Sequence, residues 1–162
     1  MSITTTVVST LEELETTAGL AHQIWHEYYT DILGEAQVNY MVNTMQNAET
    51  MKKQIENGMV YCNIYWQGKA AGYFAVEPQG DKLFLSKFYI SQAFRGKGIF
   101  KAVLGEIISH SQGMQCVYLT VNKGNKNAIE AYKKLGFTQT DAIETNIENG
   151  FIMDDYVMQK NI

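Results

Sequence analysis

One loop constrains the fold of this chain more than any other feature: Phe94–Lys101 (FRGKGIFK), which holds two glycines and three cations. The run before it, Leu83–Ile90, is apolar and aromatic as in a strand, and apolar residues recur at helical spacing from Val103 to Ile108. Glycine lets a ligand approach the backbone closely, and the first turn of a helix presents unpaired N–H groups. We therefore expect a strand–loop–helix unit that binds an anion such as a phosphate or pyrophosphate.

The rest of the pattern predicts helices and strands in a mixed order. The first strand is expected at Thr4–Val8, followed by a long helix that Ser9 or Thr10 caps and that ends before Gly34. Ser9 and Glu12 have the spacing of a capping box. The further expected elements are helices at Val38–Met45 and Met51–Gly58, strands at Met59–Trp66, Ala70–Val76 and Leu83–Ile90, a helix closed by Gly113, a strand at Cys116–Val121, a helix at Asn127–Leu135, and strands at Phe137–Ile147 and Phe151–Met158.

This order predicts the α/β (α+β) class, with a mixed, mostly antiparallel central sheet, one crossover near its middle, and helices that flank it. The last two strands are expected to form a hairpin about Glu148-Asn149-Gly150, because Asn-Gly between strand-like runs is a strong turn signal. A chain of 162 residues suits a single domain, here residues 1–162.

Two familiar phosphate-binding motifs do not fit the glycine loop. A P-loop needs a Gly-Lys-Ser/Thr ending, which the loop lacks, and a dinucleotide fingerprint needs a third glycine where Lys101 stands. Arg95, Lys97 and Lys101 can add charge-assisted contacts to a phosphate. Taken alone, the loop is equally consistent with an ordinary glycine-rich turn that carries solvated cations.

A second motif downstream decides between these interpretations. It contains Asn125, Ala128 and Tyr132 at fixed spacing, followed by Gly136-Phe137. Together with Arg95, Gly98 and the position of Phe100 in the glycine loop, these residues resemble the two signatures of the GNAT superfamily of acyl-CoA-dependent N-acetyltransferases. The resemblance extends over nearly the whole chain from about Thr4, and it implies the GNAT fold, with a central sheet that is splayed at the cofactor cleft.

The resemblance also implies acetyl-CoA as the co-substrate and assigns residues to it. Backbone groups of the strand before the glycine loop would contact the pantetheine arm, N–H groups of the loop would contact the phosphates, and Asn125, with Asn122 as a weaker candidate, would hydrogen-bond the pantetheine. The cofactor-binding residues expected on this basis are Phe88, Tyr89, Ile90, Arg95, Gly96, Lys97, Gly98, Ile99, Phe100, Lys101, Asn122 and Asn125. Phe100 departs from the family pattern, which has a small residue there; we expect its ring to pack beneath the loop.

Transfer of an acetyl group to an amine needs a free lone pair, a stabilised oxyanion and a proton for the leaving thiolate. Tyr132 matches the general acid of the family, and a backbone N–H near Phe88 or Tyr89 would bind the oxyanion. The alternative for Tyr132 is a helix tyrosine packed on the core. The general base is left open among Glu27, His22, His26, Asp154 and Asp155.

The acceptor site is expected between the first helix and the last strands. His22, Trp25, His26 and Tyr29 share one helix face, which indicates either an amine pocket or an aromatic core stripe. Trp25, Tyr29 and Asp154 are the expected substrate-binding residues; for Asp154 and Asp155 the alternative is hairpin surface charge, and adjacent strand positions put at most one of them in a pocket. Trp25 with Tyr28-Tyr29, ILGEAQVNYMV, LFLSKFYIS and ENGFIMDDYVMQK resemble the PaiA-type acetyltransferases, some of which act on polyamines.

The composition narrows the classes of partner. A net charge of −4 disfavours a general nucleic-acid binder and suits a cationic small substrate. Cys62 and Cys116 lie in apolar runs, which predicts two buried hydrophobes and no metal site. The N-terminal MSITTTVVST has no targeting signal, so a cytoplasmic protein without membrane contact is expected.

Three functions stay open: a small-molecule amine acetyltransferase, a protein N-terminal or lysine acetyltransferase, and a non-catalytic acyl-CoA-binding module. A homodimer that pairs through the C-terminal hairpin is compatible with the superfamily.

Overall fold

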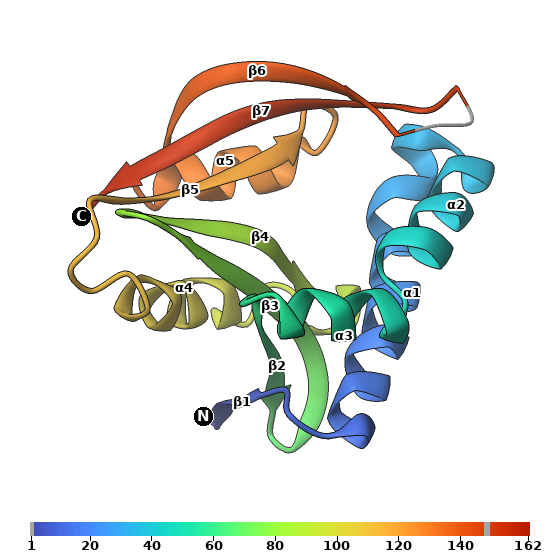
Figure 1. The fold of residues 1–162 in the computed structure, drawn as a ribbon, viewed down its shortest axis with the longest axis horizontal. Coiled ribbons are helices and arrows are strands. Elements are labelled where there is room, and N and C mark those ends of the chain that lie inside the picture. Colours follow the sequence, from blue (N-terminus) through green and yellow to red (C-terminus); the bar gives the residue numbers. More distant parts are fainter. Residues whose placement is uncertain (1, 148–149) are drawn as a thin grey trace.

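A seven-stranded sheet forms the centre of the protein in a computed structural model that describes residues 2–147 and 150–162. Its strand order is β1-β2-β3-β4-β5-β7-β6, and β4 and β5 form its parallel pair while every other neighbouring pair is antiparallel. The strands are β1 (Ile3–Val7), β2 (Val60–Trp66), β3 (Lys69–Gln79), β4 (Lys82–Ile90), β5 (Cys116–Asn122), β6 (Thr138–Asn146) and β7 (Ile152–Asn161) (Figure 1). The expected mixed, mostly antiparallel sheet with one crossover is therefore confirmed.

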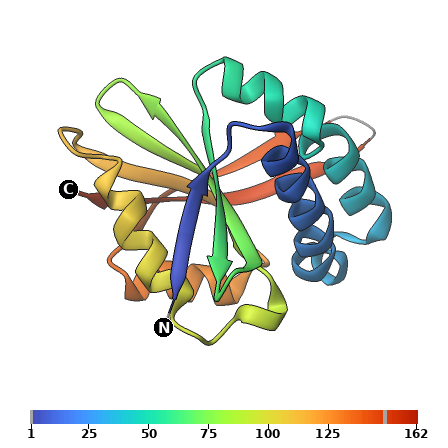
Figure 2. The same cartoon turned by 90° about the horizontal axis from the view of Figure 1, so that it is seen from below.

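Helices cover both faces of this sheet. On one face lie α1 (Leu11–Leu33), α2 (Glu35–Met45) and α3 (Ala48–Glu56), and on the other lie α4 (Ile99–Ser109) and α5 (Lys126–Lys134) (Figures 1 and 2). A 3₁₀ turn, Gln92–Phe94, joins β4 to the glycine loop. Each face has its own core: Trp25, Met41 and Tyr73 belong to the core beneath α1–α3, while Phe74 and Ile107 belong to the core beneath α4 and α5.

Local signals in the sequence explain most element boundaries, with two corrections. The capping box of α1 is formed by Thr10 and Glu13, not by Ser9 and Glu12: the Glu13 N–H donates to Thr10 Oγ1, and Glu13 Oε1 accepts from the Thr10 N–H at 2.9 Å. Strand β3 continues past its expected end through Pro78. Because β2 pairs with β3 only as far as Val76, β3 has a single neighbour at Pro78, where a missing N–H is tolerated.

The central parallel pair separates halfway along its length. Strands β4 and β5 pair only between Lys82–Leu85 and Cys116–Leu119, although β4 continues to Ile90 and β5 to Asn122. At the point of separation the β3–β4 register shifts between Ala75 and Val76, which leaves Ser86 as an extra residue in β4. The sheet is thus splayed, as expected, and among the described residues no strand lies beside one backbone edge of β4 beyond Leu85.

Of the turn expected at Glu148-Asn149-Gly150, the first two residues lie outside the described residues, while the strands on either side pair as expected in a hairpin. Among the described residues, no helix is both long and apolar enough to span a membrane.

Candidate active site

A cleft of about 490 Å³ opens where β4 and β5 separate. Its walls come from β4, β5, the glycine loop, the start of α5 and the C-terminal half of α1. The sequence-predicted residues that line it are Glu27, Tyr29, Phe88, Tyr89, Ile90, Arg95, Gly96, Gly98, Ile99, Phe100, Asn125 and Tyr132. One cleft therefore brings together the glycine loop, the second motif and the first helix, which are far apart in the sequence.

The glycine loop shapes the phosphate-sized end of this cleft. Gly96 and Gly98 have φ values of +77° and +79°, in the left-handed region that favours glycine. Gly98 directly precedes α4, and no described residue accepts a hydrogen bond from the N–H groups of residues 96–101. These N–H groups and the positive end of the helix dipole can therefore hold an anion. The Lys97 and Lys101 side chains are exposed, and Lys97 Nζ lies 5.9 Å from the Trp66 ring centroid.

Phe100 packs as expected beneath the loop. Its ring stacks on that of Phe88 at 4.3 Å and 7°, and it meets the ring of Tyr132 edge-on at 5.2 Å. The side chain therefore joins the core on the α4 face, while its backbone N–H belongs to the unpaired set at the helix start. The Phe100 ring is thus directed into the core and not onto the loop backbone.

Tyr132 projects from α5 into the cleft and is 6% exposed. Its ring is held edge-on between Phe100 and Phe137, whose centroid lies 5.3 Å away, and no described residue hydrogen-bonds its hydroxyl. Burial raises the pKa of Tyr132 well above its ordinary value, and the charges of Tyr28 and Tyr29 add to this effect. The phenol therefore stays protonated throughout the physiological range and has a proton to donate.

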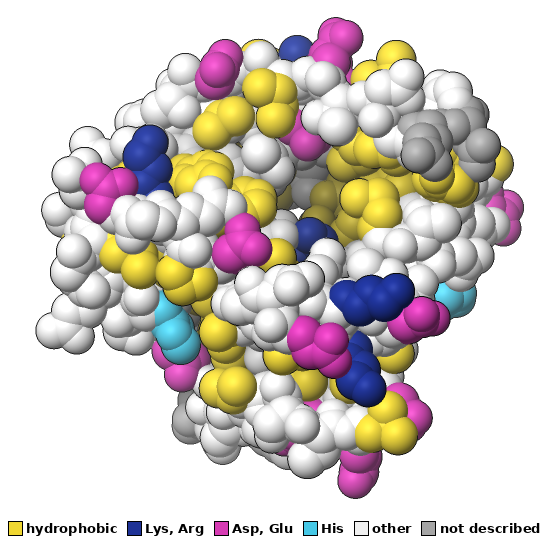
Figure 3. All heavy atoms as spheres, viewed as in Figure 1, with side chains coloured by type: hydrophobic (Ala, Val, Ile, Leu, Met, Phe, Trp, Pro, Cys, Tyr) yellow, Lys and Arg dark blue, Asp and Glu magenta, His cyan; other side chains and the backbone are white. Residues whose placement is uncertain are grey.

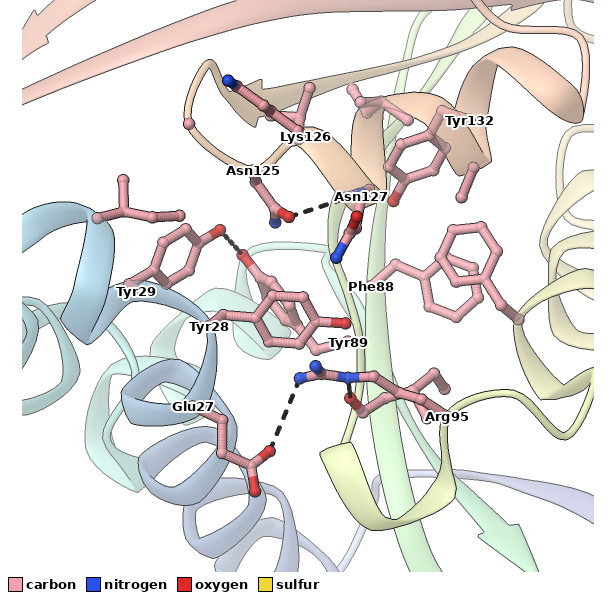
Figure 4. Close-up of a pocket in the computed structure, with 18 of the residues that line it drawn as sticks. Glu27, Tyr28, Tyr29, Phe88, Tyr89, Arg95, Asn125, Lys126, Asn127 and Tyr132 are labelled. Carbon is pink, nitrogen blue, oxygen red and sulfur yellow. Dashed lines mark hydrogen bonds and ion pairs between the residues drawn. The ribbon is translucent and has the colours of Figure 1, made fainter.

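Aromatic and charged side chains of α1 close the opposite wall (Figure 4). The hydroxyls of Tyr29 and Tyr89 are hydrogen-bonded at 3.0 Å, which ties α1 to β4. Arg95 lies over the Tyr28 ring at 4.1 Å, donates from Nε to the Ile90 carbonyl at 3.3 Å, and has its Nη2 3.9 Å from a Glu27 carboxylate oxygen. The guanidinium of Arg95 thus bridges α1 and the glycine loop across the mouth of the cleft.

The structure places Trp25 in the core rather than on the cleft. It is 3% exposed, its indole N–H donates to the Tyr73 hydroxyl at 2.9 Å, and its ring packs edge-on against Tyr29 and Tyr89. The expectation that Trp25 lines the acceptor pocket is corrected accordingly: it supports the two tyrosines from behind. His22 and His26 form a separate outer pair, with His26 Nε2 2.7 Å from Asn39 Oδ1.

The two asparagines of the second motif shape the loop between β5 and α5. Asn122 Oδ1 accepts a hydrogen bond from the Gly124 N–H at 2.8 Å, and Asn122 does not line the cleft. Asn125 caps α5 by accepting from the Ala128 N–H at 3.4 Å, and it does line the cleft, with its amide beside the Tyr29 hydroxyl. Asn125 therefore can meet a bound arm directly, whereas the Asn122 oxygen is engaged in the turn.

The adjacent aspartates of β7 point to opposite sides, and the buried one is not the one that was expected. Asp154 pairs with Lys123 Nζ at 2.8 Å, and its side chain is 47% exposed. Asp155 is 7% exposed, and it lies opposite Asn122 of β5 in the sheet. Asp154 as a substrate-binding residue is thus corrected: it forms a surface ion pair.

Sequence reasoning missed several residues of the cleft. The structure adds Tyr28, Asp31 and Ile32 of α1 and Asn127 of α5 to its lining. Tyr28 is adjacent to Tyr29, and Asp31 and Ile32 follow Glu27 and Tyr28 by four residues, so all of them lie on one side of α1. The sequence alone does not show which side of the helix faces the cleft, so these residues could be predicted only once the orientation of α1 was known.

Comparison with known proteins agrees with this geometry. The spermine/spermidine N(1)-acetyltransferase of Bacillus subtilis (strain 168) is 26% identical over 102 residues, which are 56% of this chain and 67% of that protein. An uncharacterized N-acetyltransferase of Methanocaldococcus jannaschii is 28% identical over 103 residues, 58% of this chain but only 45% of that protein. The crystal structure of the PaiA N-acetyltransferase from Thermoplasma acidophilum in complex with coenzyme A matches all of both chains, with a TM-score of 0.81 and 22% identity.

The family model described as the acetyltransferase (GNAT) family matches residues 21–137. This range contains the cleft-lining half of α1, the splayed strands, the glycine loop and Tyr132. Because the match covers well over half of the chain, the protein belongs to the GNAT acetyltransferase family.

Proposed function

We propose that this protein transfers the acetyl group of acetyl-CoA to a primary amine of a small cationic substrate, and that polyamines are the first substrates to test. The observation that carries the proposal is the splay of β4 from β5 beside a loop of unpaired N–H groups, with Tyr132 on the same cleft. The thioester of a bound acetyl-CoA would lie next to the free backbone edge of β4, the N–H groups of the glycine loop and the protonated phenol of Tyr132.

Coenzyme A fits the described residues at two independent places. The free edge of β4 beyond Leu85, at Phe88, Tyr89 and Ile90, offers backbone groups to the amides of the pantetheine arm. The unpaired N–H groups of residues 96–101 offer donors to the pyrophosphate. Arg95 can add a charged contact if its guanidinium leaves Glu27, a pair that exchanges easily at 3.9 Å in a partly exposed site.

Residues in the walls of the cleft can also carry out the proposed acetyl transfer. A neutral amine attacks the thioester carbonyl, a backbone N–H near Phe88 or Tyr89 stabilises the oxyanion, and Tyr132 gives a proton to the sulfur as the C–S bond breaks. The raised pKa of Tyr132 keeps the phenol protonated before the reaction. The tyrosinate that remains can then take the second proton from the nitrogen, so the phenol is restored.

The charges around the α1 wall support a cationic acceptor. Glu27 and Asp31, four residues apart, line the cleft together with the faces of Tyr28 and Tyr29. Carboxylates and aromatic faces attract alkylammonium groups. The spermine/spermidine N(1)-acetyltransferase among the relatives points in the same direction.

One observation favours a second candidate, the acetylation of a peptide or protein N-terminus. Lys87 of β4 is half-buried and lies one residue before Phe88; its Nζ donates to Ser86 Oγ at 2.7 Å and forms no ion pair with a described carboxylate. Burial lowers the pKa of Lys87 to about 8, opposed by the charge of Glu77. Lys87 does not itself line the cleft, but an ammonium between the cleft-lining Ser86 and Phe88 disfavours a polycation nearby and favours the carbonyl or carboxylate oxygens of a peptide.

Two measurements test the proposal. Isothermal titration with acetyl-CoA should show saturable binding, and its absence would contradict the proposal at the cofactor stage. A panel of spermidine, spermine, a lysine peptide, an N-terminal alanine peptide and an aminoglycoside, followed by thiol release, should then show the highest kcat/KM for the polyamines. A higher kcat/KM for the N-terminal peptide would favour the second candidate instead.

A further inference from the structure

A buried carboxylate with one unpartnered oxygen lies on β7, on the face of the sheet that the end of α1 covers. Asp155 of β7 is 7% exposed, and its Oδ1 has no hydrogen-bond partner among the described residues. Lys123, whose charge acts on Asp155, is already paired with Asp154 at 2.8 Å. A charged group is seldom buried without compensation, because the loss of hydration costs more than the surroundings return. A carboxylate of this kind is more typical of a binding or catalytic residue than of a residue that only stabilises the fold.

The register of the sheet fixes the direction in which Asp155 points. It lies directly opposite Asn122 of β5, so the two side chains share one face of the sheet. The end of α1 packs on that face, since the Ile32 side chain reaches the backbone of Gly124, two residues after Asn122. Asp154, the preceding residue, points to the other face.

Asp155 is electrostatically linked to the cleft through Tyr29. Burial, and in addition the charge of Asp155, raise the pKa of Tyr29 to about 12, while the hydrogen bond from Tyr89 opposes this. Tyr29 and Tyr89 both line the cleft, and the charges of Tyr28 and Tyr29 reach Tyr132 in turn. The charge of Asp155 thus acts on Tyr29, which lines the cleft, while the proposed general acid Tyr132 projects from the α5 side of the same cleft. Figure 3 shows a hollow near the middle of the view, with hydrophobic side chains on either side of it and charged side chains close to its rim.

We propose that Asp155 binds the ammonium form of the acceptor amine beside Tyr29 and accepts the proton that the amine must lose before it attacks the thioester. This inference rests on the proposed function and adds the residue that determines acceptor binding. It selects Asp155 among the five bases that the sequence left open: Asp154 is paired with Lys123, Glu27 accepts from the Gln92 N–H at 3.0 Å, and the two histidines form the outer pair.

The protons balance in this scheme. The ammonium gives one proton to the Asp155 carboxylate, which becomes a neutral carboxyl, and the neutral nitrogen then forms the C–N bond while the C–S bond breaks. Tyr132 gives its proton to the thiolate and regains one from the nitrogen of the new amide. Asp155 finally releases its proton to solvent, so the net products are the amide, the thiol and one proton.

The environment of Asp155 suits this exchange. Burial, and in addition the charge of the neighbouring Asp154, raise the pKa of Asp155 to about 6, while the charge of Lys123 opposes both. These two residues and Tyr29 are the charged or titratable groups that act on Asp155 from β7, the β5–α5 loop and α1. The carboxylate is therefore ionised at neutral pH yet basic enough to hold a proton briefly.

Kinetics with Asp155→Asn test the proposal, with Asp141→Asn on the exposed face of β6 as the matched control. We expect kcat/KM for the amine to fall about 100-fold or more, the Kd of acetyl-CoA to stay the same, and the acid limb of the kcat/KM profile near pH 6 to disappear. Asp154→Asn should instead move that limb to lower pH, because it removes the charge that raises the pKa of Asp155. An unchanged amine KM and acid limb in Asp155→Asn would overturn the proposal.

A measurement without turnover separates this proposal from the proposed function. The Asp155 carboxyl can be titrated by carbon NMR in the wild-type enzyme with bound coenzyme A, with and without saturating spermidine, after assignment with Asp155→Asn. A bound ammonium should lower the pKa of Asp155 by about 1 unit. A shift without turnover would contradict acetyl transfer to spermidine but support the binding site, whereas turnover without a shift would refute the role of Asp155 alone.

Discussion

The rings of Phe88 and Phe100 lie parallel, 4.3 Å apart and tilted by only 7°, and this pair joins the two halves of the proposed cofactor site. Phe88 belongs to the β4 segment beyond the splay, and Phe100 belongs to the first turn of α4. The stack fixes the free strand edge relative to the loop of unpaired N–H groups. The Phe100 ring therefore supports the loop from below, and the N–H groups of the loop keep no hydrogen-bond partner among the described residues.

Phe100→Ala should separate the stability of this pair from cofactor binding. We expect the free energy of unfolding to fall by about 2 kcal/mol, because a partly buried ring and its contacts with Phe88 and Tyr132 are lost. The Kd of coenzyme A should change less than about 3-fold, since the N–H groups are unchanged. Urea denaturation and calorimetric titration check both values. Phe84→Ala, which removes a ring stacked on Tyr118 at 4.9 Å, is the matched control for loss of a stack elsewhere in the sheet.

The cofactor end of the cleft could be predicted from sequence because its signals are local. Glycines at fixed spacing, the strand before them and the cap of α5 at Asn125 each depend on a few neighbouring residues. The structure confirms the expected elements and their order, while the roles of the individual cofactor-binding residues stay predictions.

The acceptor end could not be predicted because it depends on register and helix rotation. Asp154 and Asp155 differ by one position in β7, and a shift of one residue exchanges the faces of a strand. Only the pairing of Asp155 with Asn122 decides which carboxylate is buried. Likewise, four helical positions from His22 to Tyr29 share a wide arc, and tertiary packing alone puts Trp25 in the core and leaves His22 exposed.

Gly98→Ala should weaken cofactor binding more than it weakens the fold. A side chain at φ +79° costs about 1 kcal/mol, although no atom within 4 Å blocks the new methyl group. The methyl group also lies on the loop where phosphate is proposed to bind, so we expect the Kd of coenzyme A to rise about 10-fold or more. Gly80→Ala, in the β3–β4 turn at φ +64° with equally open space, should lose similar stability without any change in Kd. Equal effects on Kd would argue against the loop as the phosphate site.

Tyr132→Phe should lower kcat by about 100-fold and leave the Kd of acetyl-CoA unchanged, because only the proton donor is removed and the ring contacts with Phe100 and Phe137 remain. Burial raises the pKa of Tyr132, so the wild-type enzyme should show no alkaline limb from this residue below about pH 10. Stopped-flow or steady-state thiol release across the pH range checks both expectations. Tyr118→Phe is the control for loss of a phenol away from the cleft. A kcat for Tyr132→Phe within a few-fold of wild type would show that Tyr132 serves packing only.

Asp155→Asn should make the protein more stable while it makes the enzyme slower. The folded-state pKa of Asp155, about 6, lies above the unfolded value, so the folded protein binds a proton more tightly than the unfolded chain. The stability that this carboxyl contributes is therefore present at low pH, declines between about pH 4 and pH 6, and is absent above, where the buried charge costs about 3 kcal/mol. The amide of Asp155→Asn removes that charge, so the increase in the free energy of unfolding should be on the order of 1 kcal/mol larger at pH 8 than at pH 5.

Urea denaturation at these two pH values measures the difference, and Asp141→Asn should show no such dependence on pH. A variant that is less stable than wild type at pH 8 would mean that the Asp155 carboxylate is compensated within the fold, and the case for a ligand ammonium would fail with it.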